Sequence, residues 1–317
     1  MLTYILFVIG FALLIKGAGY LVEGASAVGK RLGLSSLFIG LTIVAFGTSA
    51  PELFVNIIAS VKGNADIAIG NIVGSNIINI LFILGIAAII YPLNVHLNTT
   101  RKEIPFSLLA VVVLGLLVND GLIDGYNFNV LSRSEGLVLL GFFIVFMYYT
   151  VGIMREGKSG GVEIKAYNAW LAWLMVAGGL VGLMVGAKWV VDGGVAIAHN
   201  FGLSEALIGL TLVAVGTSLP ELATSAVAAY KRQPDIAIGN VVGSNIFNIF
   251  WILGVSAFIR PIEFSPALNS DILVLTAVTI LLLVAIYVGK RNVLQKWEGY
   301  GFLLLYILYV AFLVYRG

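Results

Sequence analysis

The sequence predicts an all-α membrane protein with ten transmembrane helices, arranged as a 5+5 inverted-topology repeat with broken core helices. Three observations lead to this prediction. The chain is 60% hydrophobic and only 11% charged, which is unlike the composition of a soluble domain of this size. Apolar runs of membrane-spanning length cover nearly all of its 317 residues. Finally, two motifs in the first half of the chain return in the second half.

Ten apolar runs give the predicted membrane spans. Each is close to the ~20 residues that an α-helix needs to cross the hydrocarbon core of a bilayer. The segments between the runs are short, so we expect no large soluble domain. The runs lie near residues 2–23, 35–60, 67–90, 104–119, 134–152, 169–190, 204–229, 236–259, 271–288 and 298–315.

The two repeated motifs are long. Residues 40–56 read GLTIVAFGTSAPELFVN, and residues 209–225 read GLTLVAVGTSLPELATS. Residues 66–80 read DIAIGNIVGSNIINI, and residues 235–249 read DIAIGNVVGSNIFNI. Both pairs are 169 residues apart, and 24 of the 32 aligned positions are identical. Further along the chain the offset shortens to 163, where Glu135 aligns with Glu298.

Each repeat covers five predicted spans. An odd number of spans makes the second copy enter the membrane from the opposite side, which is an inverted-topology repeat of the kind found in many secondary transporters. We therefore expect a first five-helix repeat at residues 1–152 and a second, inverted one at residues 169–317. Residues 153–168 are short, Gly-rich and mixed in charge, which is typical of a solvated linker.

The basic residues predict an orientation in the membrane. Loops after the odd-numbered spans carry 12 Lys and Arg residues, whereas the opposite side carries five. Because Lys and Arg are enriched in cytoplasmic loops, we expect those loops and the linker in the cytoplasm and both termini outside. The expected location is the cell (plasma or inner) membrane. The net charge of +2 indicates no nucleic-acid partner.

The first motif carries the most informative residues, Glu52 and Glu221. Each lies in an apolar stretch, where an ionisable side chain is costly and indicates a functional site. Residues three and four positions apart share a helix face, so Thr48, Ser49, Thr217 and Ser218 are expected beside these carboxylates. Proline lacks the N–H of a regular helix, and the prolines before each Glu should interrupt the span. We expect the interruption to expose the backbone carbonyls of Ala45 and Ala214 as cation ligands.

The S-x-x-E pattern has a second interpretation. It is the pattern of a capping box, in which a Ser and a Glu satisfy the N–H groups at the start of a helix. Both roles are compatible, because the cap would start the second part of a broken helix. Capping alone does not explain why the pattern occurs twice beside a second polar motif.

The second motif repeats the same chemistry. Ser75 and Asn79 are four residues apart, as are Ser244 and Asn248, so a hydroxyl and an amide oxygen project from one helix face in each copy. The two motifs together supply carboxylate, hydroxyl, amide and carbonyl oxygens. Ca²⁺ binds ~6–8 such oxygens, and Na⁺ uses similar ligands. The chain has no Cys, and its two His lie outside the motifs, which disfavours a Zn²⁺ or Cu²⁺ site.

At these motifs the chain resembles the cation/Ca²⁺ exchanger superfamily, and within it a prokaryotic Na⁺/Ca²⁺ exchanger. The residues that carry the resemblance are GTSAPE (47–52), GTSLPE (216–221), GNIVGSNIIN (70–79) and GNVVGSNIFN (239–248). The resemblance implies one Ca²⁺ site with flanking Na⁺ sites, and it covers the whole chain. It also implies that the first and sixth spans slide as a gating bundle.

The resemblance also implies a role for each site residue. Glu52 and Glu221 would bind both ions. Ca²⁺ coordination would be completed by Thr48, Thr217 and the carbonyls of Ala45 and Ala214. The Na⁺ sites would include Ser49, Ser218, Ser75 and Ser244, and the centre would hold Asn79 and Asn248. K⁺-dependent relatives have an Asp at the position of Asn248, so this residue argues against K⁺ transport.

The expected function is a secondary antiporter that extrudes Ca²⁺ in exchange for Na⁺ by alternating access, with three Na⁺ per Ca²⁺ implied by the resemblance. An H⁺- or K⁺-coupled Ca²⁺ antiporter is the main alternative, and a cation channel is a weaker one. The motifs contain no nucleophile–His pair and no HExxH sequence, so we expect no enzyme. Ca²⁺ and Na⁺ are expected as transported substrates and the lipid bilayer as surroundings, without an organic cofactor or an obligate protein partner.

Overall fold

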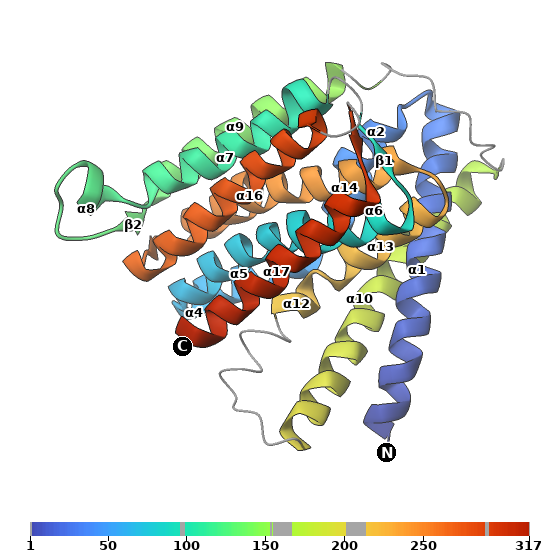
Figure 1. The fold of residues 1–317 in the computed structure, drawn as a ribbon, viewed down its shortest axis with the longest axis horizontal. Helices are drawn as coiled ribbons and strands as arrows, with labels where there is room; N and C mark the ends of the chain where they lie inside the picture. Colours follow the sequence, from blue (N-terminus) through green and yellow to red (C-terminus); the bar gives the residue numbers. More distant parts are fainter. Residues whose placement is uncertain are drawn as a thin grey trace.

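A computed structural model describes residues 2–95, 99–152, 154, 167–200, 214–288 and 292–316, and most of these residues are helical (Figure 1). The first half contains α1 (Leu2–Leu32), α2 (Ser36–Ile39), the π-helical η1 (Gly40–Val44), α3 (Ala45–Thr48), α4 (Ala50–Lys62), α5 (Ala65–Ile77), the π-helical η2 (Ile78–Ile83), α6 (Leu84–Ile90), β1 (Leu93–Asn94), the π-helical η3 (Thr99–Glu103), α7 (Ile104–Leu117), α8 (Asp120–Ile123), β2 (Val130–Leu131) and α9 (Arg133–Gly152).

The second half repeats this order of elements. It contains α10 (Ala169–Asn200), α12 (Ala214–Thr217), α13 (Leu219–Tyr230), α14 (Pro234–Ile246), the π-helical η5 (Phe247–Leu253), α15 (Gly254–Ile259), β3 (Ile262–Glu263), the 3₁₀ turn η6 (Pro266–Leu268), α16 (Asn269–Val288), β4 (Val293–Leu294) and α17 (Lys296–Arg316). Of the predicted linker 153–168, the structure describes only Met154, Tyr167 and Asn168.

The described residues contain seven helices long and apolar enough to cross a membrane, or eight when the bent pair Ser36–Thr48 and Ala50–Lys62 is counted as one span. The predicted spans agree with these helices in type and place. Two of them are less complete. The span predicted at 104–119 corresponds to α7, which η3 precedes, and residues 204–213 of the span predicted at 204–229 lie outside the described part of the chain.

The first helix of each half is longer than predicted. α1 continues to Leu32 and α10 to Asn200, although the sequence analysis ended these spans near residues 23 and 190. Gly24 and Gly29 remain inside α1, and the helix ends only before Gly33, which has a φ of +67°. The N–H of Leu34 donates to the carbonyl of Gly29, as expected when a left-handed glycine ends a helix.

Close glycine contacts join α1 and α10 side by side along one flank of the molecule (Figure 1). A Cβ added at Gly10 would lie 2.9 Å from the carbonyl oxygen of Gly186, and one added at Gly17 would lie 2.9 Å from that of Gly179. These contacts show that the helices run antiparallel. The two pairs also interchange under the 169-residue offset, so equivalent helices of the two halves point in opposite directions.

We predict that Gly186→Ala lowers the thermal stability of the protein, because the new methyl group would lie 2.8 Å from the carbonyl oxygen of Gly10. Overpacking of this kind costs about 1–3 kcal/mol. The matched control is Gly178→Ala on the same helix, where a Cβ meets nothing within 4 Å among the described residues. Thermal unfolding of both variants in detergent tests the prediction, and equal melting temperatures would contradict it.

Two short strand pairs lie at opposite ends of the helix bundle. β1 pairs with β4 through Leu93 and Leu294, and β2 pairs with β3 through Leu131 and Ile262. Leu93 and Ile262 are 169 residues apart, whereas Leu131 and Leu294 are 163 apart, which are the two offsets of the sequence repeat. Each pair therefore joins a strand of one half to a strand of the other, and the offsets convert one pair into its counterpart.

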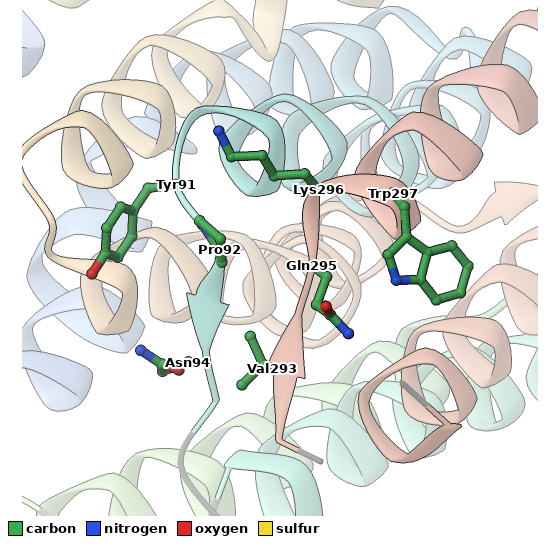
Figure 2. A pocket seen from close by; sticks show the side chains of 7 residues that line it. All are labelled: Tyr91, Pro92, Asn94, Val293, Gln295, Lys296 and Trp297. Carbon is green, nitrogen blue, oxygen red and sulfur yellow. The ribbon is translucent and has the colours of Figure 1, made fainter. Parts of the chain in front are cut away.

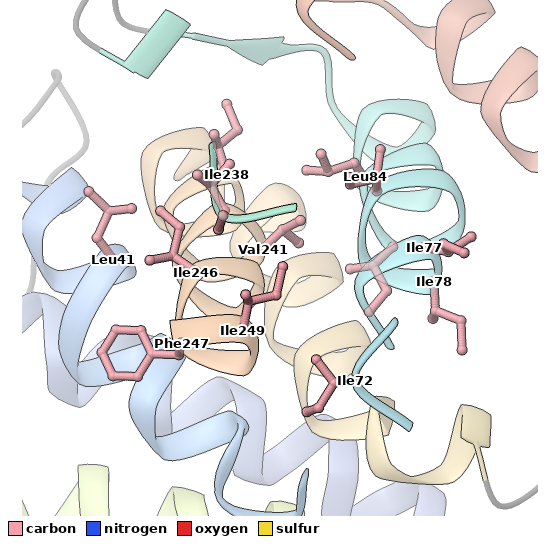
Figure 3. Packing of buried hydrophobic residues seen from close by; sticks show 14 of the residues in the cluster. Leu41, Ile72, Ile77, Ile78, Leu84, Ile238, Val241, Ile246, Phe247 and Ile249 are labelled. Atoms are coloured by element: carbon pink, nitrogen blue, oxygen red, sulfur yellow. The ribbon is translucent and has the colours of Figure 1, made fainter. Parts of the chain in front are cut away.

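The helices that carry the second motif form the centre of the protein. The spans Ile67–Ile90 and Pro234–Ile259 are 78% buried inside the protein, against 22–44% for the other long spans. Figure 3 shows the aliphatic side chains of these two spans, such as Ile77 and Ile246, packed in the interior. The polar motifs therefore lie in the most enclosed part of the molecule, where they are shielded from lipid by the surrounding helices.

Candidate functional site

The first motif breaks its span in both halves. α3 ends at Thr48, and α4 begins at Ala50 after a bend of 46° at Ser49. Pro51 is in the first turn of α4. The N–H groups of a first turn have no partner within their own helix, so the proline removes no hydrogen bond from α4. The second half has the same arrangement, with α12 ending at Thr217 and α13 beginning at Leu219. The break predicted from sequence is confirmed in both halves.

Each break places a glutamate in the first turn of the following helix. Glu52 and Glu221 are both 1% exposed. The Ser49 hydroxyl donates to Oε1 of Glu221 at 2.9 Å, and the Ser218 hydroxyl lies 3.5 Å from Oε1 of Glu52. These two contacts interchange under the 169-residue offset. A serine of each half thus reaches the carboxylate of the other half, so the two halves of the chain converge on one buried site.

The hydroxyl contacts decide between the two interpretations of the S-x-x-E pattern. Neither Ser49 nor Ser218 makes a side-chain hydrogen bond to the start of its own helix. Each hydroxyl instead reaches the carboxylate of the opposite half. A capping box requires a local bond to the backbone, so these serines do not cap their helices, and their hydroxyls belong to the buried site.

One serine of the second motif contacts the same residues. Ser244 is buried, and its hydroxyl oxygen lies 2.9 Å from that of Ser49 and 3.4 Å from Oε1 of Glu221. Ser75, its counterpart in the first half, is also buried, and its hydroxyl has no hydrogen-bond partner among the described residues.

The threonines contact asparagines that the sequence analysis did not identify. The Thr48 hydroxyl donates to Oδ1 of Asn240 at 3.0 Å, and the Thr217 hydroxyl lies 3.4 Å from Oδ1 of Asn71. Asn71 and Asn240 are the first asparagines of the GN-x-x-G-SN motif in the two copies. The sequence shows that both copies have an asparagine at this position, which could have marked these residues as candidates. The spacing of the motif does not say which residue of the other half they contact.

The amides of Asn79 and Asn248 are buried in the π-helical segments η2 and η5. The helix with Glu221, α13, packs against η2, and the helix with Glu52, α4, packs against η5. A π-helical turn shifts the register of the side chains that follow, and such turns are frequent at functional sites. The sequence analysis did not predict these turns, because no residue pattern in the motif distinguishes them from α-helix.

The carbonyls of Ala45 and Ala214 differ from each other. The Ala45 carbonyl accepts the N–H of Ser49 at 3.0 Å, and the Thr48 hydroxyl oxygen lies 3.3 Å from it, so this carbonyl keeps its helical bond and is not freed as expected from sequence. In the second half the N–H of Ser218 donates to Val215, one residue after Ala214, at 3.1 Å. Pro51 removes a donor two residues beyond Ser49, which explains why the carbonyl of Ala45 keeps its bond.

Five buried oxygens of the predicted ligands have no hydrogen-bond partner among the described residues: Glu52 Oε2, Glu221 Oε2, Ser75 Oγ, Asn79 Oδ1 and Asn248 Oδ1. Leaving one buried acceptor unsatisfied costs about 1–3 kcal/mol, and more for a charged group. A cation that binds several of these oxygens at once would offset this cost. Carboxylate, hydroxyl and amide oxygens are hard ligands, which suit Ca²⁺ and Na⁺.

The rest of the described structure offers no competing metal centre. Within the described residues, no three His, Cys, Asp or Glu side chains come together as a metal cluster. A cavity of about 520 Å³ lies beside the β1–β4 strand pair and includes Lys296 and Trp297 in its wall (Figure 2). It contains none of the residues of the two motifs and lies at the end of the bundle, so it is separate from the buried carboxylates.

Comparisons with known proteins point to one family. The chain matches the sodium/calcium exchanger protein family over residues 2–152 and 171–315. It is 32% identical over 353 residues to the sodium/calcium exchanger MaX1 of Methanosarcina acetivorans, covering 98% of this chain and 97% of that protein. It is 37% identical over 315 residues to the inner membrane protein YrbG of Escherichia coli, covering 96% and 94% of the two chains.

Solved structures give the same result. The fold superposes on the sodium-calcium exchanger NCX_Mj, in crystals soaked with 10 mM Na⁺ and zero Ca²⁺, with a TM-score of 0.83, 34% identity and 98% coverage of both chains. The same similarity holds for that exchanger soaked with Na⁺ and Sr²⁺.

Proposed function

Because the chain belongs to the sodium/calcium exchanger family, we propose that it is a Na⁺-driven Ca²⁺ antiporter and that Glu52 and Glu221 bind the transported ions. One observation carries the proposal: each half contributes one buried carboxylate to a shared site, and oxygens around them lack hydrogen-bond partners among the described residues. The other ligands proposed from the resemblance are Thr48, Thr217, Ser49, Ser218, Ser75, Ser244, Asn79, Asn248 and the carbonyl of Ala214.

The charge of the site favours exchange over leakage. Two nearby carboxylates repel each other at low dielectric and require positive charge to remain ionised. One Ca²⁺ balances both charges, and several Na⁺ ions do so together. A site that is costly without cations favours a change of access with ions bound, which is the requirement for an antiporter. A stoichiometry of three Na⁺ per Ca²⁺ makes each cycle move one net charge.

The main alternatives couple Ca²⁺ to H⁺ or K⁺. Protons compete with metal ions for the same carboxylates, so H⁺ coupling has to be tested separately. Asn248 is neutral, so the site has two buried acids and not three, which disfavours an additional K⁺ ion. A cation channel requires a continuous pore, whereas both carboxylates are only 1% exposed.

We propose that the protein lies in the cell membrane with ten spans, with both termini outside and residues 153–168 in the cytoplasm. Both termini lie towards the lower side of Figure 1, as an even number of spans requires. The distribution of Lys and Arg among the loops supports the cytoplasmic assignment of the linker side. Reporter fusions at either terminus test this orientation.

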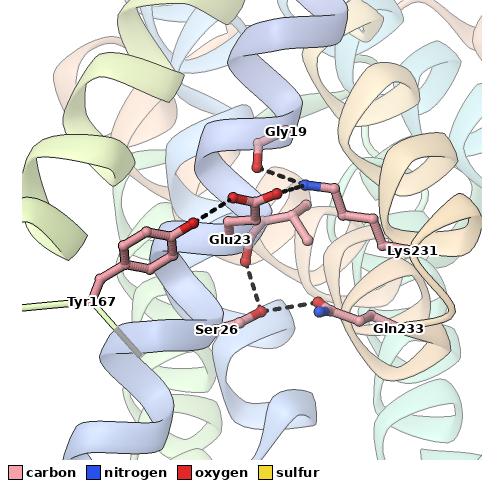
Figure 4. A network of polar contacts seen from close by, with 7 residues as sticks. Gly19, Glu23, Ser26, Tyr167, Lys231 and Gln233 are labelled. Atoms are coloured by element: carbon pink, nitrogen blue, oxygen red, sulfur yellow. Dashed lines mark hydrogen bonds and ion pairs between the residues drawn. The ribbon is translucent and has the colours of Figure 1, made fainter. Parts of the chain in front are cut away.

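The contacts of α1 support alternating access. On the proposed cytoplasmic side, Lys231 at the end of α13 forms an ion pair with Glu23 of α1 at 2.7 Å and donates to the Gly19 carbonyl at 3.0 Å (Figure 4). The Tyr167 hydroxyl donates to the same carboxylate at 3.1 Å. These contacts hold α1 against the end of the second-half motif helix.

The counterparts in the other half are arranged differently. The residues that correspond to Glu23 and Lys231 under the offset are Asp192 and Lys62. Asp192 pairs with Lys188 of its own helix at 3.0 Å, with side chains 53% and 72% exposed. None of the ion pairs between described residues includes Lys62. Within this part of the chain, the contact is thus formed on one side of the pseudo-symmetric molecule only, as expected for one of two access states.

Transport in proteoliposomes tests the function. Vesicles loaded with Na⁺ should take up Ca²⁺ when the external Na⁺ is removed, and uptake should stop when the internal and external Na⁺ concentrations are equal. Uptake should increase when the vesicle interior is positive, because Na⁺ efflux exceeds Ca²⁺ entry in charge. Separate arms replace the Na⁺ gradient with an H⁺ or a K⁺ gradient. Uptake driven equally well by either gradient would contradict Na⁺ coupling, and unitary currents would indicate a channel.

A further inference from the structure

Each copy of the second motif contains three asparagines, and the proposed function uses only the last of them. The remaining four, at positions 71, 76, 240 and 245, are polar groups inside the protein, and three of them are at most 2% exposed. A buried amide that binds no ion must serve another purpose or be satisfied locally. The hydrogen bonds of Asn76 and Asn245 indicate what that purpose is.

The orientation of these amides follows from the backbone. The side chain of Asn245 lies 3.4 Å from the carbonyl oxygen of Asn76, and the side chain of Asn76 lies 3.2 Å from that of Asn245. A carbonyl oxygen only accepts hydrogen bonds, so each side chain must turn its NH₂ group toward the opposite backbone. The amide oxygen Oδ1 of each then faces the other way.

Those oxygens contact the two asparagines of the ion site. Oδ1 of Asn245 accepts the NH₂ of Asn79 at 2.9 Å, and Oδ1 of Asn76 accepts the NH₂ of Asn248 at 2.9 Å. Both contacts cross between the halves and interchange under the 169-residue offset. With their NH₂ groups held, Asn79 and Asn248 keep Oδ1 free of any hydrogen-bond partner among the described residues.

We propose that Asn76 and Asn245 are positioning residues that make Asn248 and Asn79 present an oxygen, and not an NH₂ group, to the transported cation. This inference rests on the proposed function, because it assigns a role to residues behind the same site. An amide side chain has a donor end and an acceptor end of nearly equal shape. Only the oxygen end attracts a cation, so an amide ligand requires a neighbour that determines which end faces the ion.

The first asparagine of the motif orients a threonine hydroxyl by the same kind of contact. Asn240 donates its NH₂ to the Ser225 hydroxyl at 2.9 Å and to the Glu221 carbonyl at 3.3 Å, which turns its oxygen toward Thr48. The Thr48 hydroxyl donates its hydrogen to that oxygen at 3.0 Å. A hydroxyl that has donated its hydrogen keeps its lone pairs for a cation. The motif thus orients neutral ligands of two kinds by one principle.

A double-mutant cycle between Asn245 and Asn79 tests the proposal. In the native Asn79 background, Asn245→Leu frees the Asn79 amide to rotate, and we expect the apparent Ca²⁺ affinity in proteoliposome exchange to fall about tenfold. In the Asn79→Asp background the same change should cost less than about threefold, or should improve affinity. The carboxylate of Asn79→Asp has two equivalent oxygens and needs no orientation. In addition, Asn245→Leu removes the amide oxygen that would repel this carboxylate.

A purely structural role of Asn245 predicts a different result, because Asn245→Leu would then lower affinity by the same factor in both backgrounds. That result would overturn the proposal. The readout is the Ca²⁺ concentration for half-maximal exchange, which should change more than the maximal rate. The control cycle pairs Asn119→Leu, which removes a hydrogen bond to Asn269 outside the site, with Asn79→Asp, and its effects should be additive.

The two-fold related cycle keeps the test decisive if Asn245→Leu does not fold. It combines Asn76→Leu with Asn248→Asp, and the same dependence on background is expected. Glu52→Gln in the same assay separates this inference from the proposed function. Ca²⁺ exchange that survives Glu52→Gln would refute the ion site itself. Exchange that is lost in Glu52→Gln, together with additive asparagine cycles, would refute only the positioning role.

Discussion

Glu52→Gln and Glu221→Gln are each expected to abolish Ca²⁺ exchange while the protein remains folded. Either change leaves a divalent cation with one balancing charge in a site that is only 1% exposed. Removing one partner of a buried charge pair costs about 3–5 kcal/mol, which lowers affinity on the order of 100-fold or more. The packing around the break should be preserved, because a glutamine at position 221 keeps an amide oxygen that can still accept the hydrogen bond from Ser49.

Na⁺-dependent ⁴⁵Ca²⁺ uptake and direct Ca²⁺ binding measure this loss. The matched control is Glu135→Gln, which neutralises a carboxylate that accepts the N–H and hydroxyl of Ser132 at the start of α9. That variant should lose at most about 1 kcal/mol of stability and should retain transport. Full exchange in either site variant, or equal loss in the Glu135 control, would argue against the assignment of the carboxylates.

The local features of this site were predictable from the sequence. A glutamate in an apolar run is costly wherever the chain folds, and a proline inside such a run interrupts the helix, so Glu52 and the break at Ser49 could be inferred without coordinates. The duplication then indicated that two such breaks meet. These inferences depend on residues close together in the chain, where helix geometry determines which side chains share a face.

The contacts between the halves were not predictable in the same way. The sequence places Ser49 near Glu52, but the structure bonds its hydroxyl to Glu221, 172 residues away. Helix periodicity indicates which face of α4 is polar and does not identify the residues opposite that face. The π-helical turns at Asn79 and Asn248 were not predictable either, because no residue pattern in the motif distinguishes them from α-helix. The prediction of a free carbonyl at Ala45 was wrong, because this carbonyl is paired with the N–H of Ser49, which Pro51 does not remove.

Linking α1 to α13 is expected to arrest transport completely. The chain has no cysteine, so Glu23→Cys with Lys231→Cys introduces the only two thiols. The Glu23 and Lys231 side chains are longer than cysteine, so two cysteines at these positions would be too far apart for a direct disulfide. A short bifunctional thiol reagent with a reducible spacer is therefore required. Because Glu23 and Lys231 are 2.7 Å apart at their charged atoms, the reagent should hold the access state described here. Reductive release of the link should restore exchange.

The inverted repeat predicts a second, complementary link. If the two halves exchange roles during transport, Asp192 leaves Lys188 and approaches Lys62 in the opposite access state. Lys62→Cys with Asp192→Cys should therefore react with the same reagent only when that state is populated, and ion conditions that favour this link should disfavour the first. Lys188→Cys with Asp192→Cys, on one helix, is the control and should react under all conditions without arresting transport. Both inter-helix links forming together in one four-cysteine protein would contradict alternation, because a ligand or link can trap only one of two mutually exclusive states.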